Sequence, residues 1–294
     1  MIPMKLLDWI DKNKLKYKYL ASNPNAIQFL KENPEKIDWS ILSDNPNAID
    51  LIKDNLNRIN WSLLSKNPSA IEILRANPDK VDNFYLSGNP AAIEFLKENP
   101  HKINWYSFAK NPAAIDYMRS RPDKIIWNLV SCNPNAIEFL KENPDKINWE
   151  FISINPNAIS LLRANIDKLD YYYLSENPNA IKILRENQDK IDWDNLSNNP
   201  NAIELLKQNF EKINWLALSG NPGAIELLKE NQDNIDWYMI ATNPAIFNYD
   251  YKQMQDSNKD LKEEIIAAAL NPKRLFKLLE DYDKDEVYNA YFNY

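Results

Sequence analysis

The apolar residues of this chain recur in a fixed pattern with a period of 22 residues. In residues 133–154, NPNAIEFLKENPDKINWEFISI, the fourth, fifth and eighth positions are Ala136, Ile137 and Leu140. Spacings of three and four residues place such side chains on one face of a helix. A second apolar group follows around Trp149. The pattern predicts two short antiparallel helices, A and B, in every repeat.

An Asn-Pro pair opens each repeat and marks the register. Repeat positions are numbered from this asparagine, which is residue 23, 45, 67, 89, 111, 133, 155, 177, 199, 221 and 243, without insertion or deletion. Asparagine caps a helix by accepting from an early backbone N–H, and proline at the first helical position loses no hydrogen bond. Helix A is therefore predicted to begin at Pro24 and its equivalents. It is expected to end near position 11, which is usually Asn and tolerates the left-handed conformation, just after a Lys or Arg at position 9.

Helix B has its own start signal. Position 16 is Asp or Asn in nine repeats, with Ile126 as the exception, and is predicted to be the N-cap. Position 17 is Trp in eight repeats, with Asn83 and Tyr171 as substitutes. Because these rings are spaced one repeat apart, we expect them to form a column.

The repeats must stack to be stable, because isolated helices shorter than about 12–15 residues are marginal in water. The alanine kept at position 4, from Ala26 to Ala224, indicates close approach of adjacent A helices. The sequence therefore predicts an all-α fold, an α/α solenoid of ten 22-residue two-helix repeats with N- and C-terminal helical caps. Stacked in a line, the repeats would make an open rod or shallow superhelix roughly 100 Å long.

The register divides the chain into three segments. Residues 1–22 are a degenerate repeat and are predicted to form the N-terminal cap, and residues 23–244 hold the ten repeats. Residues 245–294 lose the register. They are predicted to form a C-terminal helical cap, with a long helix over residues 261–279, or alternatively a docking tail that ends in the acidic, aromatic segment DYDKDEVYNAYFNY.

Composition and charge narrow the class of protein. The net charge of −7 and the pI near 5.0 oppose binding to phosphate backbones and anionic membranes. No apolar run is long enough to span a membrane, and the charged N-terminal residues do not fit a signal peptide. A single cysteine cannot form an internal disulfide. We therefore expect an intracellular protein that is not secreted and has no membrane segment.

Residues with catalytic or metal-binding chemistry are scarce. One histidine, one cysteine and three glycines leave no zinc ligand set and no glycine-rich phosphate loop. His101 stands where most repeats have Asp or Glu and is interpreted as a surface variant, and Cys132 as an exposed, inert thiol. We expect no enzymatic activity, no metal site and no cofactor.

Two rows of cations, at positions 9 and 14, could follow a nucleic-acid backbone. Acidic residues at positions 6 and 13 stand beside them, which is typical of exposed ion pairs three residues apart and of charges that complement the helix dipole. Positions 18 and 19 are too apolar for a base-reading code. Nucleic acid is therefore the less favoured partner.

Positions 18, 19 and 22 vary between repeats, whereas packing and capping explain the constant positions. Exposed aromatic side chains there would be the anchors typical of protein interfaces. Alternatively, many of them complete the core between B helices. The candidate protein-binding surface consists of Phe84, Tyr85, Tyr106, Phe151, Tyr172, Tyr173 and Tyr238.

The unit NPNAIEFLKENPDKINW resembles the short Asn-Pro-Asn-Ala-Ile tandem repeats of giant DNA virus proteins, from viruses that infect amoebae and algae. The resemblance covers residues 23–244. It implies a viral origin and a repeat architecture, and it favours a role in the virus particle or in the host cytoplasm.

Three functions remain open at this point. The first is a repeat-protein scaffold that binds a viral or host protein through the variable positions. The second is a structural or spacer component of a virus particle, with self-association through the ends of the rod. The third and least favoured is nucleic-acid binding along the Lys/Arg rows.

Overall fold

The protein is built from short helices, and its repeats form a closed ring. The computed structural model describes residues 3–259, and the chain divides into two compact units. One unit comprises Leu6–Asn248, and the other comprises Met1–Lys5 and Tyr249–Tyr294. The prediction of an all-α repeat solenoid is confirmed, because within the described residues the only strands are β1 (Met4–Leu6) and β2 (Phe247–Tyr249), which pair in a two-stranded sheet.

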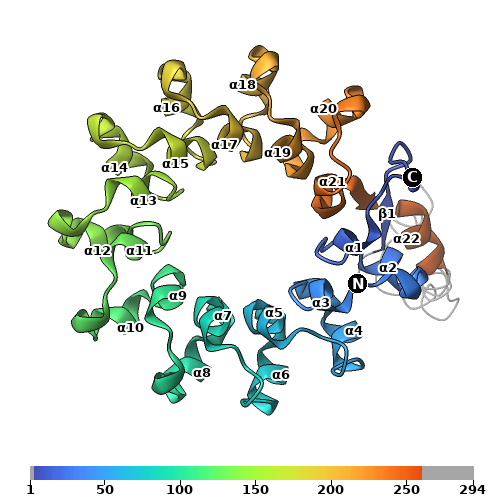
Figure 1. Ribbon diagram of the computed structural model, residues 1–294, viewed down its shortest axis with the longest axis horizontal. Helices are drawn as coiled ribbons and strands as arrows, with labels where there is room; N and C mark the ends of the chain where they lie inside the picture. Colours follow the sequence, from blue (N-terminus) through green and yellow to red (C-terminus); the bar gives the residue numbers. More distant parts are fainter. Residues whose placement is uncertain (1–2, 260–294) are drawn as a thin grey trace, which may run out of the picture. The chain divides into compact units, whose positions relative to one another are not determined.

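Two concentric rows of helices make up the Leu6–Asn248 unit. Its B helices form the inner circle and its A helices the outer circle (Figure 1). The B helices are α1 (Tyr17–Leu20), α3 (Trp39–Leu42), α5 (Trp61–Lys66), α7 (Asn83–Gly88), α9 (Trp105–Lys110), α11 (Trp127–Ser131), α13 (Trp149–Ser153), α15 (Tyr171–Glu176), α17 (Trp193–Asn198), α19 (Trp215–Gly220) and α21 (Met239–Thr242). The A helices are α2 (Ile27–Glu32), α4 (Ile49–Lys53), α6 (Ile71–Ala76), α8 (Ile93–Glu98), α10 (Ile115–Arg119), α12 (Ile137–Glu142), α14 (Ile159–Arg163), α16 (Ile181–Glu186), α18 (Ile203–Gln208) and α20 (Ile225–Glu230).

Helix A is shorter than predicted, because a tight turn replaces its first residues. In this turn the N–H of Ala48 donates to the carbonyl of Asn45, three residues back, at 3.1 Å. The α-helix then starts at position 5 with Ile49. Several of these turns are regular 3₁₀ helices, namely η2 (Pro46–Ala48), η3 (Pro68–Ala70), η4 (Pro90–Ala92), η11 (Pro222–Ala224) and η13 (Pro244–Ile246).

A second 3₁₀ turn, which the sequence pattern did not predict, joins helix A to helix B. It occupies positions 12 to 14 of most repeats. The turns are η1 (Pro34–Lys36), η5 (Pro100–Lys102), η6 (Pro122–Lys124), η7 (Pro144–Lys146), η8 (Ile166–Lys168), η9 (Gln188–Lys190), η10 (Phe210–Lys212) and η12 (Gln232–Asn234).

The asparagine at position 11 ends helix A differently from the prediction. No residue among those described has a positive φ, so the prediction of a left-handed cap is wrong. Asn143 has φ −131° and ψ 61°, and its side-chain amide donates to the Phe139 carbonyl at 2.9 Å. The residue therefore satisfies a helix-terminal carbonyl with its side chain and not through its backbone conformation.

The N-caps of helix B are confirmed, including the exception. The Asn148 side chain accepts from the N–H of Phe151 at 2.8 Å, whereas Ile126 provides no side-chain cap to α11. At the same junction position 21 is Ala109, where most repeats have a serine. Helix α11 therefore begins without either of the polar side chains that support most of the other B helices.

Neighbouring repeats pack mainly through their B helices, since α5, α7, α9 and α11 contact one another in succession. The position 4 alanines, such as Ala48 and Ala70, are fully buried. They lie in the turns η2 and η3, which contact each other. The small side chain therefore permits close approach of adjacent turns, which corrects the expectation that adjacent A helices approach at this residue.

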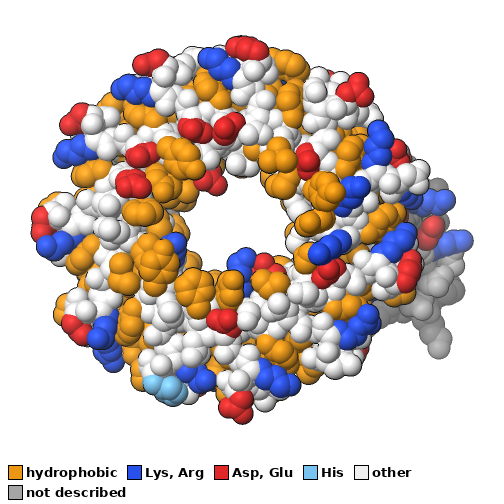
Figure 2. Space-filling model, viewed as in Figure 1, with side chains coloured by type: hydrophobic (Ala, Val, Ile, Leu, Met, Phe, Trp, Pro, Cys, Tyr) orange, Lys and Arg blue, Asp and Glu red, His pale blue; other side chains and the backbone are white. Residues whose placement is uncertain are grey.

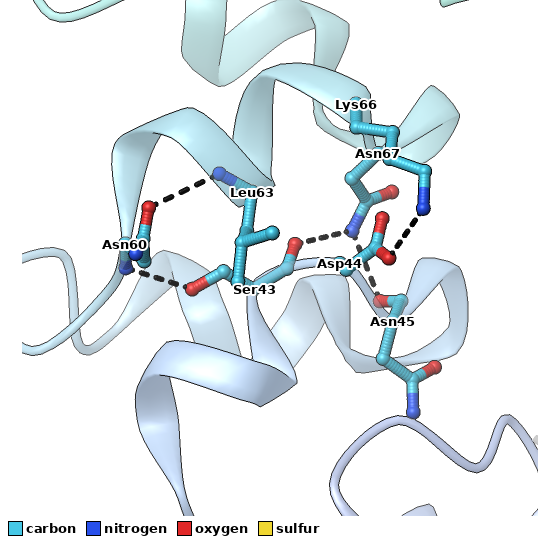
Figure 3. A network of polar contacts seen from close by, with 7 residues as sticks. All are labelled: Ser43, Asp44, Asn45, Asn60, Leu63, Lys66 and Asn67. Carbon is cyan, nitrogen blue, oxygen red and sulfur yellow. Dashed lines mark hydrogen bonds and ion pairs between the residues drawn. The ribbon is translucent and has the colours of Figure 1, made fainter. Parts of the chain in front are cut away.

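The position 1 asparagine joins each repeat to the one before it. The amide of Asn67 donates to the carbonyls of Ser43 and Asn45, each at 3.0 Å (Figure 3). The Asn67 Oδ1 accepts from the N–H of Ser69 at 2.9 Å. A second link lies beside it, where the N–H of Asn60 donates to the Ser43 hydroxyl at 2.9 Å. The same two amide bonds recur at every position 1 asparagine, and each of these asparagines is almost completely buried.

The bonds of the position 1 asparagines form a ladder from repeat to repeat, and the same ladder joins the last repeat to the first. Asn23 donates to the carbonyls of Ala241 at 3.1 Å and Asn243 at 2.8 Å, and α1 packs against α21. The rings of Tyr19 and Tyr238 meet edge to face with centroids 5.6 Å apart. The prediction of an open rod is therefore wrong, because the repeats of the Leu6–Asn248 unit curve until their ends meet.

The ring is closed by an eleventh repeat, the closing unit, whose residues come from the two ends of the repeat array. Asn243 and the turn η13 supply its start, and residues 6–22 supply its helix B, α1. Leu7 donates to the carbonyl of Ile246 at 2.9 Å, and Leu15 and Leu20 are buried. The predicted N-terminal cap thus occupies an eleventh repeat position and joins the ends of the array.

Of the predicted C-terminal segment, residues 245–259 are described. Helix α22 (Tyr251–Ser257) is capped by Asp250, which accepts from the N–H of Gln253 at 3.0 Å. The helix predicted for residues 261–279 and the final acidic, aromatic segment lie outside the described residues.

We predict that Asn133→Ala destabilises the ring by about 3 kcal/mol, because it removes a helix cap and the amide hydrogen bonds to two buried carbonyls of the preceding repeat. These carbonyls belong to Ala109 and Asn111, at 3.0 and 2.8 Å. Urea unfolding followed by far-UV circular dichroism measures the change. The control is Asn135→Ala, which removes one exposed bond to Pro112 at a position that is alanine in Ala91 and Ala113. Equal losses for the two variants would contradict the ladder.

We also predict that Asn23→Ala increases backbone hydrogen exchange in both α1 and α21, which lie at opposite ends of the repeat array in the sequence. The reason is that its amide donates across the closure, so both helices lose a neighbour together. Hydrogen–deuterium exchange read by mass spectrometry tests this, with Asn133→Ala as the comparison at a distant junction. Faster exchange in α1 alone would indicate an open chain of repeats.

Candidate functional site

The inner circle of B helices carries the variable positions on its exposed side. In α9, Phe108 and Ala109 face the core and are fully buried, whereas Tyr106 is 50% exposed. Position 18 is exposed in nearly every B helix, while positions 20 and 21 are buried. Figure 2 shows hydrophobic side chains around the central opening of this unit.

The predicted aromatic residues separate into exposed and half-buried groups. Phe151 and Tyr173, both at position 19, are half-buried against neighbouring B helices. Their rings are in contact, with centroids 5.6 Å apart. The candidate aromatic residues therefore differ in exposure, and only part of the set is available on the surface. The exposed members are Phe84, Tyr85, Tyr106, Tyr172 and Tyr238.

A pocket of about 250 Å³ lies where three of these aromatic side chains meet, on α5, α7 and α9. The rings of Phe84 and Tyr106 are nearly parallel with centroids 6.4 Å apart, and Tyr85 meets Phe84 edge to face at 5.4 Å. All of its lining residues belong to positions 18, 19 and 22, which places these three variable positions on one surface. They are Lys66, Phe84, Tyr85, Gly88, Tyr106, Ser107 and Lys110.

A second aromatic group, on α13 and α15, has acidic surroundings. Tyr172 is 57% exposed, and its ring meets that of Tyr173 edge to face at 5.2 Å. Partial burial, followed by the nearby Glu150 carboxylate, raises the pKa of the Tyr173 hydroxyl. The next exposed side chains on α15 and α17 are Glu176 and Asp194, and Figure 2 shows carboxylates on this part of the inner edge.

Two exposed residues of this surface were not in the sequence-based candidate set. Leu216, at position 18 of α19, is 57% exposed, and Lys110 lines the pocket. Both lie at variable positions, so the variability that singled out the aromatic residues also marks them. Tyr238, by contrast, has a structural role, because Tyr19 and Lys16 of the closing unit contact its ring.

The row at position 17 is a series of cation–ring contacts. Arg58 lies over the ring of Trp39 at 4.3 Å, and Lys212 lies over Trp193 at 4.4 Å. In each case the cation is at position 14 of the next repeat. Along the row of position 17 rings, a cation of one repeat therefore lies over the ring of the repeat before it. Further examples are Lys80 over Trp61, Lys168 over Trp149 and Lys190 over Tyr171.

The position 9 cations lie on the A helices and are largely paired. The predicted pairs three residues apart are confirmed at Lys53–Asp50, Lys97–Glu94, Lys141–Glu138 and Lys207–Glu204. Arg75 and Arg119 instead reach the next repeat and bind Glu98 and Glu142. The Arg75 guanidinium lowers the pKa of Glu98 through its hydrogen bond.

The single histidine and the single cysteine do not line the pocket. His101 is exposed in the turn η5, as interpreted from the sequence. Cys132 is half-buried and not fully exposed, and its thiol donates to the Leu129 carbonyl at 3.1 Å. Burial raises the pKa of the Cys132 thiol, which disfavours the reactive thiolate. Among residues 3–259, no three His, Cys, Asp or Glu side chains are grouped as a metal site, and no helix is long and apolar enough to cross a bilayer.

We predict that Tyr106→Ser and Tyr172→Ser each change the free energy of unfolding by less than about 0.5 kcal/mol, because both rings are exposed. Serine already fills position 18 at Ser40 and Ser62. The matched core variant Phe108→Ala should cost about 3–5 kcal/mol. Chemical unfolding measures all three, and a similar loss for Tyr106→Ser and Phe108→Ala would assign the aromatic row to the core.

Comparison with known proteins found no similar protein. No protein family model, no curated protein and no solved structure matches the chain.

Proposed function

We propose that the ring is a non-catalytic scaffold that binds a segment of another protein along its inner circle of B helices. The observation that carries this proposal is the row of exposed aromatic side chains at position 18 and its neighbours, above all Phe84, Tyr106 and Tyr172. Tyrosine and phenylalanine supply large contact areas at little cost in side-chain entropy, and such residues dominate binding energies at protein interfaces.

The rigidity of the ladder supports this function. Side chains held on packed B helices are already in place before a partner arrives, so less conformational entropy is lost on binding. The pocket formed by Phe84, Tyr85 and Tyr106 offers a point of attachment on the inner circle of B helices. Positions 18, 19 and 22 would thus supply contacts, while the other positions hold the ring together.

Protein is favoured over nucleic acid as the partner because of the charges. The cations of positions 9 and 14 are mostly engaged with carboxylates and rings, as at Lys97–Glu94 and Arg58–Trp39. The inner circle carries Glu150, Glu176 and Asp194, and the chain has a net charge of −7. A phosphate backbone approaching this face would meet repulsion.

The viral assignment belongs to the same proposal and rests on the repeat resemblance alone. A ring of this kind would act in the host cytoplasm or in the virus particle, on a viral or host protein. In the alternative function, a structural or spacer component, the protein would act as a ring and not as a rod. Self-association through free ends of a rod loses its basis, because Asn23 and Asn243 join those ends within the Leu6–Asn248 unit.

The test is selection of a displayed peptide library on the intact protein. We expect the selected peptides to bind a variant with Phe84→Ser, Tyr106→Ser and Tyr172→Ser about tenfold more weakly or worse, because its anchors are gone. Fluorescence anisotropy at two salt concentrations measures the affinities. Serine is native to position 18, so the variant should keep its helical circular dichroism.

The matched control lies on the A helices of the outer circle. Glu72→Ser, Glu94→Ser and Glu138→Ser change position 6, where Ser160 is native, and should leave peptide binding unchanged. Equal weakening by both triple variants would contradict an inner binding face. Tight binding of oligonucleotides that weakens steeply with salt would instead favour the nucleic-acid function.

A further inference from the structure

We propose that the pocket on α5, α7 and α9 binds an acidic peptide segment by one large apolar or aromatic side chain. This inference rests on the proposed protein-binding function and names the chemistry of the partner. It commits to one half of the inner circle, because the two aromatic groups on that circle have charges of opposite sign around them.

The pocket has room for one anchoring side chain. Its volume of about 250 Å³ lies below the range of about 300–1,000 Å³ that is common for small-molecule sites. The parallel rings of Phe84 and Tyr106 and the edge-on ring of Tyr85 give it apolar walls. A hydrophobic or aromatic side chain placed between such rings gains burial and ring contacts together.

Gly88 keeps the pocket open. It stands at position 22, where the preceding and following repeats have Lys66 and Lys110. A Cβ built on Gly88 would approach nothing closer than the Ser107 Cβ, at 3.9 Å. The space above the glycine is therefore unfilled, and a lysine stands on each side of it in the repeat order.

The charge at this pocket is positive. Lys66 is paired with Asp44 at 2.8 Å, but the Lys110 ammonium lies 5.1 Å from the Tyr106 ring centroid and has no carboxylate partner among residues 3–259. An acidic residue beside the anchoring side chain of a peptide could pair with Lys110. That pair would lie next to the apolar contact and fix the direction of the peptide.

The second aromatic group selects against the same peptide. Around Tyr172, the exposed charged side chains of positions 18 and 22 are Glu150, Glu176 and Asp194. Like charges placed opposite one another in an interface disfavour binding and suppress the wrong partner. An acidic segment should therefore bind at the Phe84–Tyr106 pocket and not at Tyr172, although both places offer exposed rings.

Two series of labelled ten-residue peptides test the proposal, with the full-length protein titrated by fluorescence anisotropy. One series is rich in Asp and Glu, the other in Lys and Arg, and each carries a single central Leu, Phe or Trp. We expect the acidic series to bind more tightly. Lys110→Glu and Tyr106→Ser should each weaken the acidic peptides about tenfold, because one removes the cation and the other a wall of the pocket.

The control is Glu176→Lys, a charge reversal at the same repeat position in the acidic half. It should leave acidic peptide binding at the pocket in place. Both residue types are native to position 22, so neither reversal should disturb the fold. Acidic peptides whose binding ignores Lys110→Glu and Tyr106→Ser would overturn the proposal.

Other outcomes separate this inference from the function on which it rests. If only basic peptides bind, and Tyr172→Ser abolishes their binding, the acidic partner is wrong while the inner protein-binding face stands. If neither series binds and the displayed library also yields no peptide that depends on the inner aromatic residues, both proposals fail.

Discussion

The buried asparagine at the start of each repeat is the constraint on which the structure depends. Its Oδ1 caps the following turn, and its amide donates to two carbonyls of the preceding repeat, as Asn133 does with Ala109 and Asn111. A buried amide or carbonyl without a partner costs more than the bond contributes when made, so the spacing and rotation between repeats are tightly fixed. When one head-to-tail contact is repeated unchanged, its rotation either closes a ring or continues as a helix. Here Asn23 makes the same bonds to Ala241 and Asn243, and the array closes.

Local features of this fold could be predicted from the sequence, while closure could not. The caps at Asn148 and its equivalents, and the missing cap at Ile126, follow from residue type and spacing within a few residues. Closure depends on a small rotation per repeat that accumulates over the whole array, and no single residue encodes it. The closing role of residues 6–22 could not be predicted for the same reason. A degenerate repeat looks like a cap until the last repeat is known to lie beside it. The end of helix A was missed for another reason, since an asparagine such as Asn143 can cap through its amide as well as through its backbone.

The candidate surface was partly predictable because variable positions stand out against a regular ladder. Position 18 lies about 200° around the helix from the core leucine at position 20, which explains the exposure of Tyr106 and Tyr172. Position 19 lies at the side, so its exposure depends on the neighbouring repeat: Tyr85 is exposed, Tyr173 is half-buried, and Ser107 is buried. The pocket could not be predicted, because it needs the absence of a side chain at Gly88 next to rings from two different repeats.

The fold does not depend on the exposed aromatic residues, because several repeats have none at position 18. Repeats with Ser40 and Ser62 at position 18 have equivalent caps and asparagine bonds, and the same core positions are filled by buried apolar residues, as in the repeat that carries Tyr106. Folding therefore does not require a ring at that position, and an exposed ring contributes little to stability where it contacts mostly water. Clustered exposed aromatic side chains on a rigid surface are instead typical of binding sites. The different charges beside the two clusters, Lys110 in one and Glu150 and Glu176 in the other, then distinguish their ligands, since neighbouring charge decides which of two apolar sites a charged segment can reach.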